Sequence, residues 1–170
     1  MAAPSFLATC HAVTKSFFVN VGGEKVKKEQ VKILVLEDDP AQRAILCLLI
    51  RSEGHEVFEA SSAVEALELL RATRFQLVLL DWELGTVLTG ADVAKEVPTG
   101  CAKFMVTGHS ITEMRTNWRD PLQGILEVVT KPVDWDNNPK TSLKALIERV
   151  EKSFEDTLPG SGSFRIRRDD

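Results

Sequence analysis

Apolar runs and amphipathic segments alternate along the chain from Val31 onward, which is the pattern of βα units around a parallel sheet. The runs predict five strands, at residues 33–36, 57–58, 75–80, 104–106 and 125–129. Residues 33–36 and 77–80 are apolar at every position, as expected for strands that helices cover on both faces. We therefore expect an α/β fold in which these two runs lie deepest in the sheet.

Helical spacing of apolar residues occurs between the runs. A first helix is predicted to end near Arg51, and a second to begin at Ser62, where Ser62 and Glu65 have the spacing of a capping box. The faces expected to be buried are made of Ala44, Ile45, Leu48 and Leu49 in the first helix and of Val64, Leu67 and Leu70 in the second.

The last helix has the clearest pattern, with Pro139 in its first turn or just before it. Its apolar face consists of Leu143, Leu146, Ile147, Val150 and Phe154. A third helix at 91–97 is short, and a fourth at 111–118 is cut off by Pro121 and Gly124. We expect the region of the fourth helix to be partly loop.

Outside the predicted core, the chain is polar or irregular. Residues 22–30 have no apolar face, so residues 1–30 are interpreted as a flexible extension or as sequence ahead of the true start of the protein. A cleaved signal or transit peptide has weaker support, because Lys15 is the one firm positive charge in residues 1–21. We expect one folded domain at 31–154, then a flexible tail at 155–170, with no output domain after it.

Composition narrows the classes of function. A formal net charge of −4 and a pI near 5.5 give no basic field for duplex nucleic acid or an anionic membrane. No apolar run approaches the roughly 18 residues of a membrane span. The three scattered cysteines lack zinc or disulfide spacing, and they indicate reduced thiols in a cytoplasmic protein: Cys10, Cys47 and Cys101.

Polar residues follow four of the predicted strands directly. Glu37-Asp38-Asp39 follows the first, Asp81 the third, Thr107 the fourth and Thr130-Lys131-Pro132 the fifth. Ligands of open parallel sheets bind beyond these carboxyl ends. Clustered carboxylates repel one another unless a cation such as Mg²⁺ holds them ionised. A lysine and a threonine hydroxyl suit phosphoryl oxygens, so the sequence predicts a site for Mg²⁺ and phosphate.

Taken singly, each of these groups has a simpler explanation. The acidic cluster could be the solvated start of a helix that Asp39 caps. Thr107 could be a hydroxyl residue that happens to end a strand, and Lys131 could belong to a simple surface turn. Their joint placement at strand ends favours a site. The histidines are isolated, lack ligand spacing and are assigned no chemistry: His11, His55 and His109.

Four motifs, in this order, resemble the receiver domains of response regulators in two-component signalling. They are Ile33-Leu34-Val35-Leu36-Glu37-Asp38-Asp39-Pro40, Leu77-Val78-Leu79-Leu80-Asp81, Met105-Val106-Thr107-Gly108 and Val129-Thr130-Lys131-Pro132. The resemblance covers 31–154 and implies a (βα)₅ flavodoxin-like fold with a doubly wound, parallel, five-stranded sheet. It also implies a cis bond between Lys131 and Pro132.

The resemblance implies a role for each residue of the site. Asp81 would be the phosphoacceptor, with Thr107 and Lys131 beside the phosphoryl group. The Mg²⁺ ligands would be Asp38 directly, Glu37 mostly through water, Asp81 itself and the backbone carbonyl of Glu83.

The implied function is that of a stand-alone response regulator rather than a conventional enzyme. A sensor histidine kinase or a histidine phosphotransfer protein would donate the phosphoryl group, and self-catalysed phosphorylation and autodephosphorylation are expected. The signal would pass to a downstream protein target, without direct contact to nucleic acid or membrane. Monomer and dimer both stay open.

Several positions depart from the usual pattern of the family. Glu37 replaces the commoner aspartate, and the loop after Asp81 has Gly85 in place of proline and is one residue longer. Val128 stands where an aromatic switch residue is common, and Trp118 lies in an irregular segment. Coupling to an output is therefore expected to differ from the usual form.

Two other functions stay open at the level of sequence. A haloacid dehalogenase-like phosphohydrolase could use Asp81, Thr107 and Lys131, but its nucleophile would lie on an early strand, ahead of the other acids. A degenerate receiver that serves only as an interaction module is the second alternative, and the intact site residues argue against it.

Overall fold

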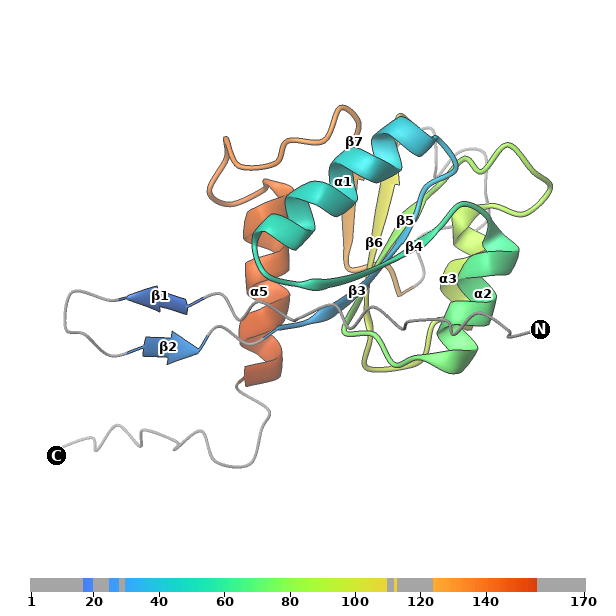
Figure 1. The fold of residues 1–170 in the computed structure, drawn as a ribbon. Coiled ribbons are helices and arrows are strands. Elements are labelled where there is room, and N and C mark those ends of the chain that lie inside the picture. Colours follow the sequence, from blue (N-terminus) through green and yellow to red (C-terminus); the bar gives the residue numbers. More distant parts are fainter. Residues whose placement is uncertain (1–16, 20–24, 28–29, 110–111, 113–123, 156–170) are drawn as a thin grey trace, which may run out of the picture.

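The structure is a computed structural model that describes residues 17–19, 25–27, 30–109, 112 and 124–155 (Figure 1). Its main sheet has five parallel strands in the order β4-β3-β5-β6-β7. The strands are β3 (Lys32–Leu36), β4 (Glu56–Ala60), β5 (Leu77–Asp81), β6 (Ala102–Thr107) and β7 (Glu127–Thr130). The described helices are α1 (Pro40–Ser52), α2 (Ala63–Ala72), α3 (Gly90–Glu96) and α5 (Leu143–Glu155). The predicted α/β fold with a doubly wound five-stranded sheet is confirmed.

The helices form one layer on each face of the sheet (Figure 1). On one face α1 and α5 pack over a core that includes Ile33, Leu79 and Phe104. On the other face α2 and α3 pack over Leu34 and Val78. Because successive residues of a strand point to opposite faces, one strand supplies both cores.

The two fully apolar runs form the centre of the sheet, as predicted. β3 pairs with both β4 and β5, and residues 33–36 and 77–80 are all buried. The ends of two predicted strands differ from the structure: Phe75 precedes β5, and Ile125 and Leu126 precede β7. Leu126 is 59% exposed, so apolar character alone extended the predicted strand too far.

The predicted buried face of α1 is wrong. Leu46, Cys47 and Ile50 are buried, whereas Ile45 and Leu48 are 59% and 68% exposed. Ala44 is also exposed and Leu49 is partly buried. Residues 44–50 are apolar at every position, so periodicity could not decide which side of the helix faces the sheet.

The start of α2 is as predicted, but its buried face is only partly so. Ser62 is the N-cap and its hydroxyl accepts a hydrogen bond from the backbone N–H of Glu65 at 3.3 Å. Val64 is 60% exposed, which contradicts the prediction, while Leu67 is partly buried and Leu70 is buried. Two small residues that the sequence interpretation passed over complete the buried face: Ala63 and Ala66.

The last helix buries its predicted face. Leu143, Leu146, Ile147 and Val150 are buried, and Phe154 packs partly against them. Pro139 is not in the first turn of α5, which begins four residues later at Leu143. α3 matches the predicted helix at 91–97 within one residue at each end. The predicted fourth helix falls mostly on residues outside those that the structure describes.

Two short strands before the main sheet were not predicted from the sequence. β1 (Phe17–Val19) pairs antiparallel with β2 (Lys25–Lys27) in a sheet of its own. Both strands fall within residues 1–30, which the sequence analysis interpreted as a flexible extension or as sequence ahead of the true start. In the part of the chain described here, every helix is too short or too polar to cross a membrane.

Candidate functional site

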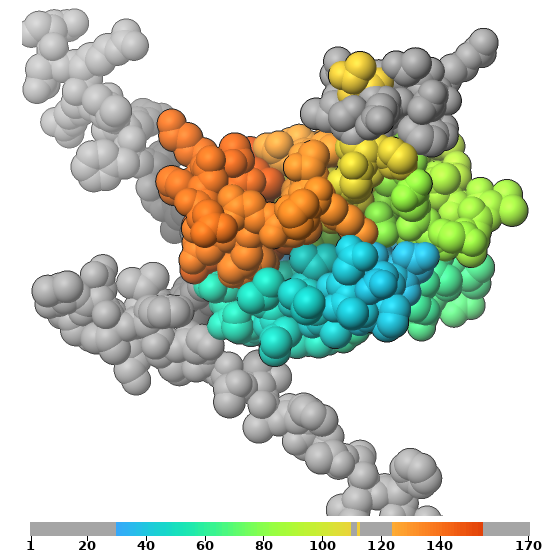
Figure 2. Space-filling model, turned by 90° about the horizontal axis from the view of Figure 1, so that it is seen from above, coloured from blue at the N-terminus to red at the C-terminus, as the bar shows by residue number. Residues whose placement is uncertain are grey.

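The carboxyl ends of β3, β5, β6 and β7 meet at one edge of the sheet. Leu36 is aligned with Leu80 in the register, Asp81 with Val106, and Thr107 with Thr130. Figure 2 shows the molecule from above: the segment of α1 and the turn before it (blue to cyan) lies beside the segment after β7 (orange). The order of the strands reverses between β3 and β5, and ligands of doubly wound folds bind at such a crevice.

The turn between β3 and α1 presents its acids through a helix cap. Oδ1 of Asp39 accepts hydrogen bonds from the backbone N–H groups of Ala41 at 2.9 Å and Gln42 at 2.8 Å, and Pro40 occupies the first turn. Asp39 is thus occupied as the N-cap of α1. The turn leaves Glu37 and Asp38 as its acids for other chemistry.

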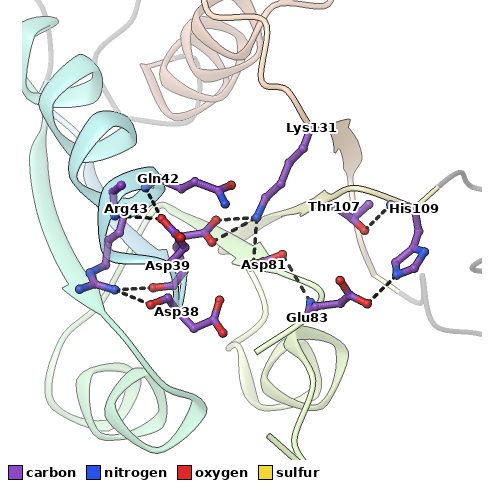
Figure 3. A network of polar contacts seen from close by, with 11 residues as sticks. Asp38, Asp39, Gln42, Arg43, Asp81, Glu83, Thr107, His109 and Lys131 are labelled. Carbon is purple, nitrogen blue, oxygen red and sulfur yellow. Dashed lines mark hydrogen bonds and ion pairs between the residues drawn. The ribbon is translucent and has the colours of Figure 1, made fainter. Parts of the chain in front are cut away.

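Three carboxylates and one ammonium group converge at this edge (Figure 3). One carboxylate oxygen from each of Glu37, Asp38 and Asp81 lies within 4.8 Å of the others. Nζ of Lys131 lies 2.9 Å from Oδ2 of Asp81 and 2.8 Å from Oε2 of Glu37. The structure therefore brings together four of the residues that the sequence selected, from three different strand ends.

Glu37 is a buried acid with an unusual pKa. Burial raises the pKa of its carboxyl to about 7, the hydrogen bond from Lys131 opposes this rise, and the charge of Asp81 adds to it. Nζ of Lys131 donates to Oε1 at 3.1 Å and forms an ion pair with Oε2 at 2.8 Å. A cation at this edge would add positive charge beside Glu37 and favour the ionised carboxylate.

Lys131 is held in its charged form by its two acidic partners. Burial, the largest single effect, lowers the pKa of this ammonium group, but the hydrogen bonds to Glu37 and Asp81 and the charges of these two acids together raise it above its ordinary value. Because its pKa is raised, the Lys131 side chain supplies a permanent positive charge beside Asp81. The Lys131–Pro132 peptide bond is cis, as the resemblance implied.

An open hollow of about 650 Å³ lies over the carboxylates. Five of the six predicted site residues line it: Glu37, Asp38, Asp81, Glu83 and Lys131. Carboxylate oxygens are the ligands that Mg²⁺ prefers, and one such oxygen from each of Glu37, Asp38 and Asp81 lies within 4.8 Å of the others. The residues present thus fit a hard divalent cation.

The loop after β5 closes one side of the hollow with glycines at two tight positions. Gly85 has a φ of +58°, and a Cβ there would lie 3.2 Å from Oδ2 of Asp38. Gly90 begins α3, and its backbone N–H donates to the carbonyl of Trp82 at 3.2 Å. Gly85, which departs from the usual pattern of the family, thus suits a left-handed backbone conformation that lies close to Asp38.

Thr107 is the sixth predicted residue, and it is completely buried at the end of β6. Its hydroxyl oxygen accepts a hydrogen bond from the backbone N–H of His109 at 3.0 Å. It is not among the residues that line the hollow, where its neighbour Gly108 stands. Thr107 therefore directly precedes a residue that lines the hollow, while its own hydroxyl faces the following turn.

Sequence reasoning missed two residues that shape the site. His109, to which no chemistry was assigned, places Nε2 2.8 Å from Oε1 of Glu83 and so joins two loops at the mouth of the hollow. Arg43 donates to the backbone carbonyls of Glu37 and Asp38. Hydrogen bonds to backbone carbonyls leave no mark in the sequence, so no pattern of residues indicated this role of Arg43.

The comparisons with known proteins agree with this geometry. The profile of the response regulator receiver domain matches residues 33–140, more than half of the chain. The transcriptional regulatory protein ZraR of Klebsiella oxytoca is 33% identical over 121 residues, which are 69% of this chain and 27% of that protein. The response regulator receiver protein Anae109_2439 of Anaeromyxobacter sp. is 30% identical over 105 residues, 60% of this chain and 43% of that protein.

Solved structures show the same fold. A CheY-like receiver domain protein from Methanospirillum hungatei aligns with a TM-score of 0.61 and 27% identity, over 75% of this chain and 99% of that one. The response regulator TrrA of Thermotoga maritima, solved in complex with Mg²⁺ and BeF, aligns with a TM-score of 0.61 and 26% identity, over 71% and 99% of the two chains.

The length of the match differs between the two comparisons. This chain spans about a quarter of the length of ZraR, whereas it covers nearly all of the single receiver structures. The family profile that matches is that of receiver domains and not that of haloacid dehalogenases. The fold, the strand-end acids and the matched profile together show that the chain belongs to the family of response regulator receiver domains.

Proposed function

We propose that this receiver domain accepts a phosphoryl group on Asp81 from a phosphohistidine of a sensor histidine kinase or a histidine phosphotransfer protein. The observation that supports it most directly is the contact between Nζ of Lys131 and Oδ2 of Asp81 at 2.9 Å. Asp81 is only 4% exposed as a residue, yet it lines an open hollow that a donor group can enter. A buried acid beside a fixed cation and an open space suits an acceptor.

In the proposed transfer, a carboxylate oxygen of Asp81 attacks phosphorus in line with the P–N bond of phosphohistidine. The new O–P bond forms as the P–N bond breaks, and the imidazole leaves and takes up a proton. Lys131 compensates negative charge on the phosphoryl oxygens, and the hydroxyl of Thr107 would turn from its neighbouring loop to donate to one of them. In autodephosphorylation water attacks phosphorus, the O–P bond breaks and inorganic phosphate is released.

We assign the Mg²⁺ site to Glu37, Asp38, Asp81 and the backbone carbonyl of Glu83. When bound, the cation would neutralise charge on the transferred phosphoryl group. The protein's part is to hold the carboxylates together, with Lys131 beside those of Glu37 and Asp81. The spacing of the three carboxylates, with one oxygen of each within 4.8 Å of the others, supports this assignment.

The signal would leave through contacts with a downstream protein. The phosphoryl group adds negative charge beside Thr107 and Lys131, and a shift between two packings of the loops around them would follow. Action as a stand-alone regulator stays a prediction, because the segment matched in ZraR is only 27% of that protein. A cytoplasmic location is likewise a prediction. An interaction module without phosphorylation would not need the Lys131–Asp81 pair.

The test uses the full chain with acetyl phosphate as the donor. With Mg²⁺, intact mass measurement should show the gain of one phosphoryl group that is labile in base. The gain should disappear with a chelator and in Asp81→Asn. Absence of the gain on the wild type, with the protein folded and Mg²⁺ present, would reject phosphoacceptance and leave the interaction module. Continuous turnover of unrelated phosphate esters would indicate a hydrolase instead.

A further inference from the structure

Arg43 reaches from the first turns of α1 back to the turn that holds the predicted metal ligands (Figure 3). Its Nη1 donates to the backbone carbonyl of Glu37 at 2.7 Å and to that of Asp38 at 3.3 Å. Its Nε lies 3.7 Å from Oε2 of Glu59, at the end of β4. The Arg43 side chain is only 18% exposed. One side chain therefore ties the acidic turn to the neighbouring strand.

The two carbonyl contacts fix the backbone on both sides of Asp38. The carbonyl of Glu37 belongs to the peptide plane before Asp38, and the carbonyl of Asp38 belongs to the plane after it. Peptide planes are rigid, so fixing both of them fixes the two backbone torsions of Asp38 and with them the direction of its Cα–Cβ bond.

The carboxylate of Asp38 depends on this backbone more than the other acids do. Lys131 holds the carboxylates of Glu37 and Asp81 directly. Among the described residues, no hydrogen bond or ion pair is formed by the carboxylate of Asp38, which is exposed to solvent. The orientation of this ligand before a cation binds is therefore set by the main chain that Arg43 holds.

We propose that Arg43 is a positioning residue, which sets the affinity of the acidic site for Mg²⁺ by orienting Asp38. The proposal rests on the proposed Mg²⁺ site of this receiver domain. Arg43 is not among the residues that line the hollow over the carboxylates. It acts through the two carbonyls and is itself steadied by Glu59.

Charge and geometry at Arg43 have opposite effects on a bound cation. The positive charge repels Mg²⁺, so its loss would strengthen binding, whereas loss of the carbonyl contacts would weaken binding. Arg43→Lys separates the two, because lysine keeps the charge but has one nitrogen in place of the planar fork. The ammonium nitrogen of lysine ends one bond short of the position of Nη1, the nitrogen that donates to both carbonyls, so it cannot reach them in the same way. Lysine also lacks the Nε–H group that faces Glu59.

The chain contains a matched control on the same helix. Arg51 also pairs with Glu59, with Nη2 2.8 Å from Oε1, and donates to the backbone carbonyl of Val57 at 3.2 Å. It makes no contact with the acidic turn in the structure. Arg51→Lys therefore repeats the chemical change and the loss at Glu59, but leaves Asp38 untouched.

The experiment measures Mg²⁺ affinity by isothermal titration calorimetry on the full chain, beside the free energy of unfolding in a chelator. Arg43→Lys should weaken Mg²⁺ binding about tenfold or more, as is typical when a group that orients a metal ligand is lost, and Arg51→Lys should stay within about twofold of the wild type. Both should lower stability by similar small amounts. A merely structural Arg43 would lower stability and leave the affinity of the folded protein unchanged.

Equal affinity of Arg43→Lys and wild type would overturn the positioning role while the Mg²⁺ site stands. Equal weakening in Arg43→Lys and Arg51→Lys would overturn it too, because the effect would then come from Glu59. A wild type that binds no Mg²⁺ would refute the metal site and this inference with it. If Arg43→Lys does not fold, Arg43→Gln is compared with Arg51→Gln, because each variant loses one positive charge. Weaker Mg²⁺ binding by Arg43→Gln than by Arg51→Gln would support the positioning role, and equal or stronger binding would overturn it.

Discussion

A Cβ on Gly90 would lie 2.0 Å from the backbone carbonyl oxygen of Asp81. Two heavy atoms cannot approach so closely, so only glycine fits where α3 begins against the end of β5. The same Cβ would also lie 2.9 Å from the carbonyl carbon of Asp81. The first residue of the helix is therefore packed directly on the backbone of the proposed phosphoacceptor.

Gly90→Ala should consequently destabilise the domain and displace Asp81. Overpacking of a tight position costs about 1–3 kcal/mol. The atoms that the Cβ would meet most closely belong to the backbone of Asp81, which cannot move aside without shifting the end of β5. Urea unfolding followed by circular dichroism measures the loss. Gly108→Ala is the control, since a Cβ there meets no atom within 4 Å. Equal stability of Gly90→Ala and the wild type would contradict the packing described here.

Mg²⁺ should stabilise the folded protein against unfolding, because the unfolded chain has no assembled carboxylate cluster. A ligand present at a hundred times its Kd adds about 2.7 kcal/mol, which thermal unfolding detects as a higher Tm. Asp38→Asn removes one charged ligand and should abolish most of this gain. Asp136→Asn, on an exposed loop away from the hollow, should retain it. A gain that survives in Asp38→Asn would place the cation elsewhere.

The two described thiols should react slowly with iodoacetamide near neutral pH. Burial raises the pKa of Cys47 to about 11 and that of Cys101 to about 11. The thiolate is the reactive form of cysteine. Raising the pKa from 9.0 to about 11 lowers the thiolate fraction at pH 8 about a hundredfold. As pH rises toward the pKa, the alkylation rate of Cys101, the more accessible of the two, should increase about tenfold per pH unit.

Mass spectrometry of peptides follows each thiol separately, with the protein in denaturant as the reference. In denaturant Cys47 and Cys101 should react at the rate of an ordinary thiol. A fast, pH-independent reaction of Cys101 in the folded protein would show that its surroundings do not disfavour the thiolate. Cys10 lies outside the described residues and is replaced by serine for this measurement.

The sheet and its acidic edge could be predicted from the sequence because both depend on local patterns. Fully apolar runs indicated central strands, and the polar residues after them had to meet at one edge of a parallel sheet. The meeting of Asp81 and Lys131 followed from that topology. Their roles as site residues came from the resemblance and stay predictions.

Side-chain contacts that depend on the assembled backbone could not be predicted. The buried face of α1 was assigned wrongly because the helix is apolar on nearly every side, and only the position of the sheet decides that Leu46 is buried and Leu48 is not. Arg43 bonds to main-chain carbonyls, which leave no mark in the sequence. His109 pairs with Glu83 across two loops that no periodicity relates.

Whether Asp81 is the phosphoacceptor can be decided by locating the modified residue. Treatment with acetyl phosphate and Mg²⁺ and then with borohydride reduces an aspartyl phosphate to homoserine, which peptide mass spectrometry assigns to one position. We expect homoserine at position 81 and none when Mg²⁺ is chelated. Homoserine at Asp38 or another acid, with position 81 unchanged, would contradict this expectation.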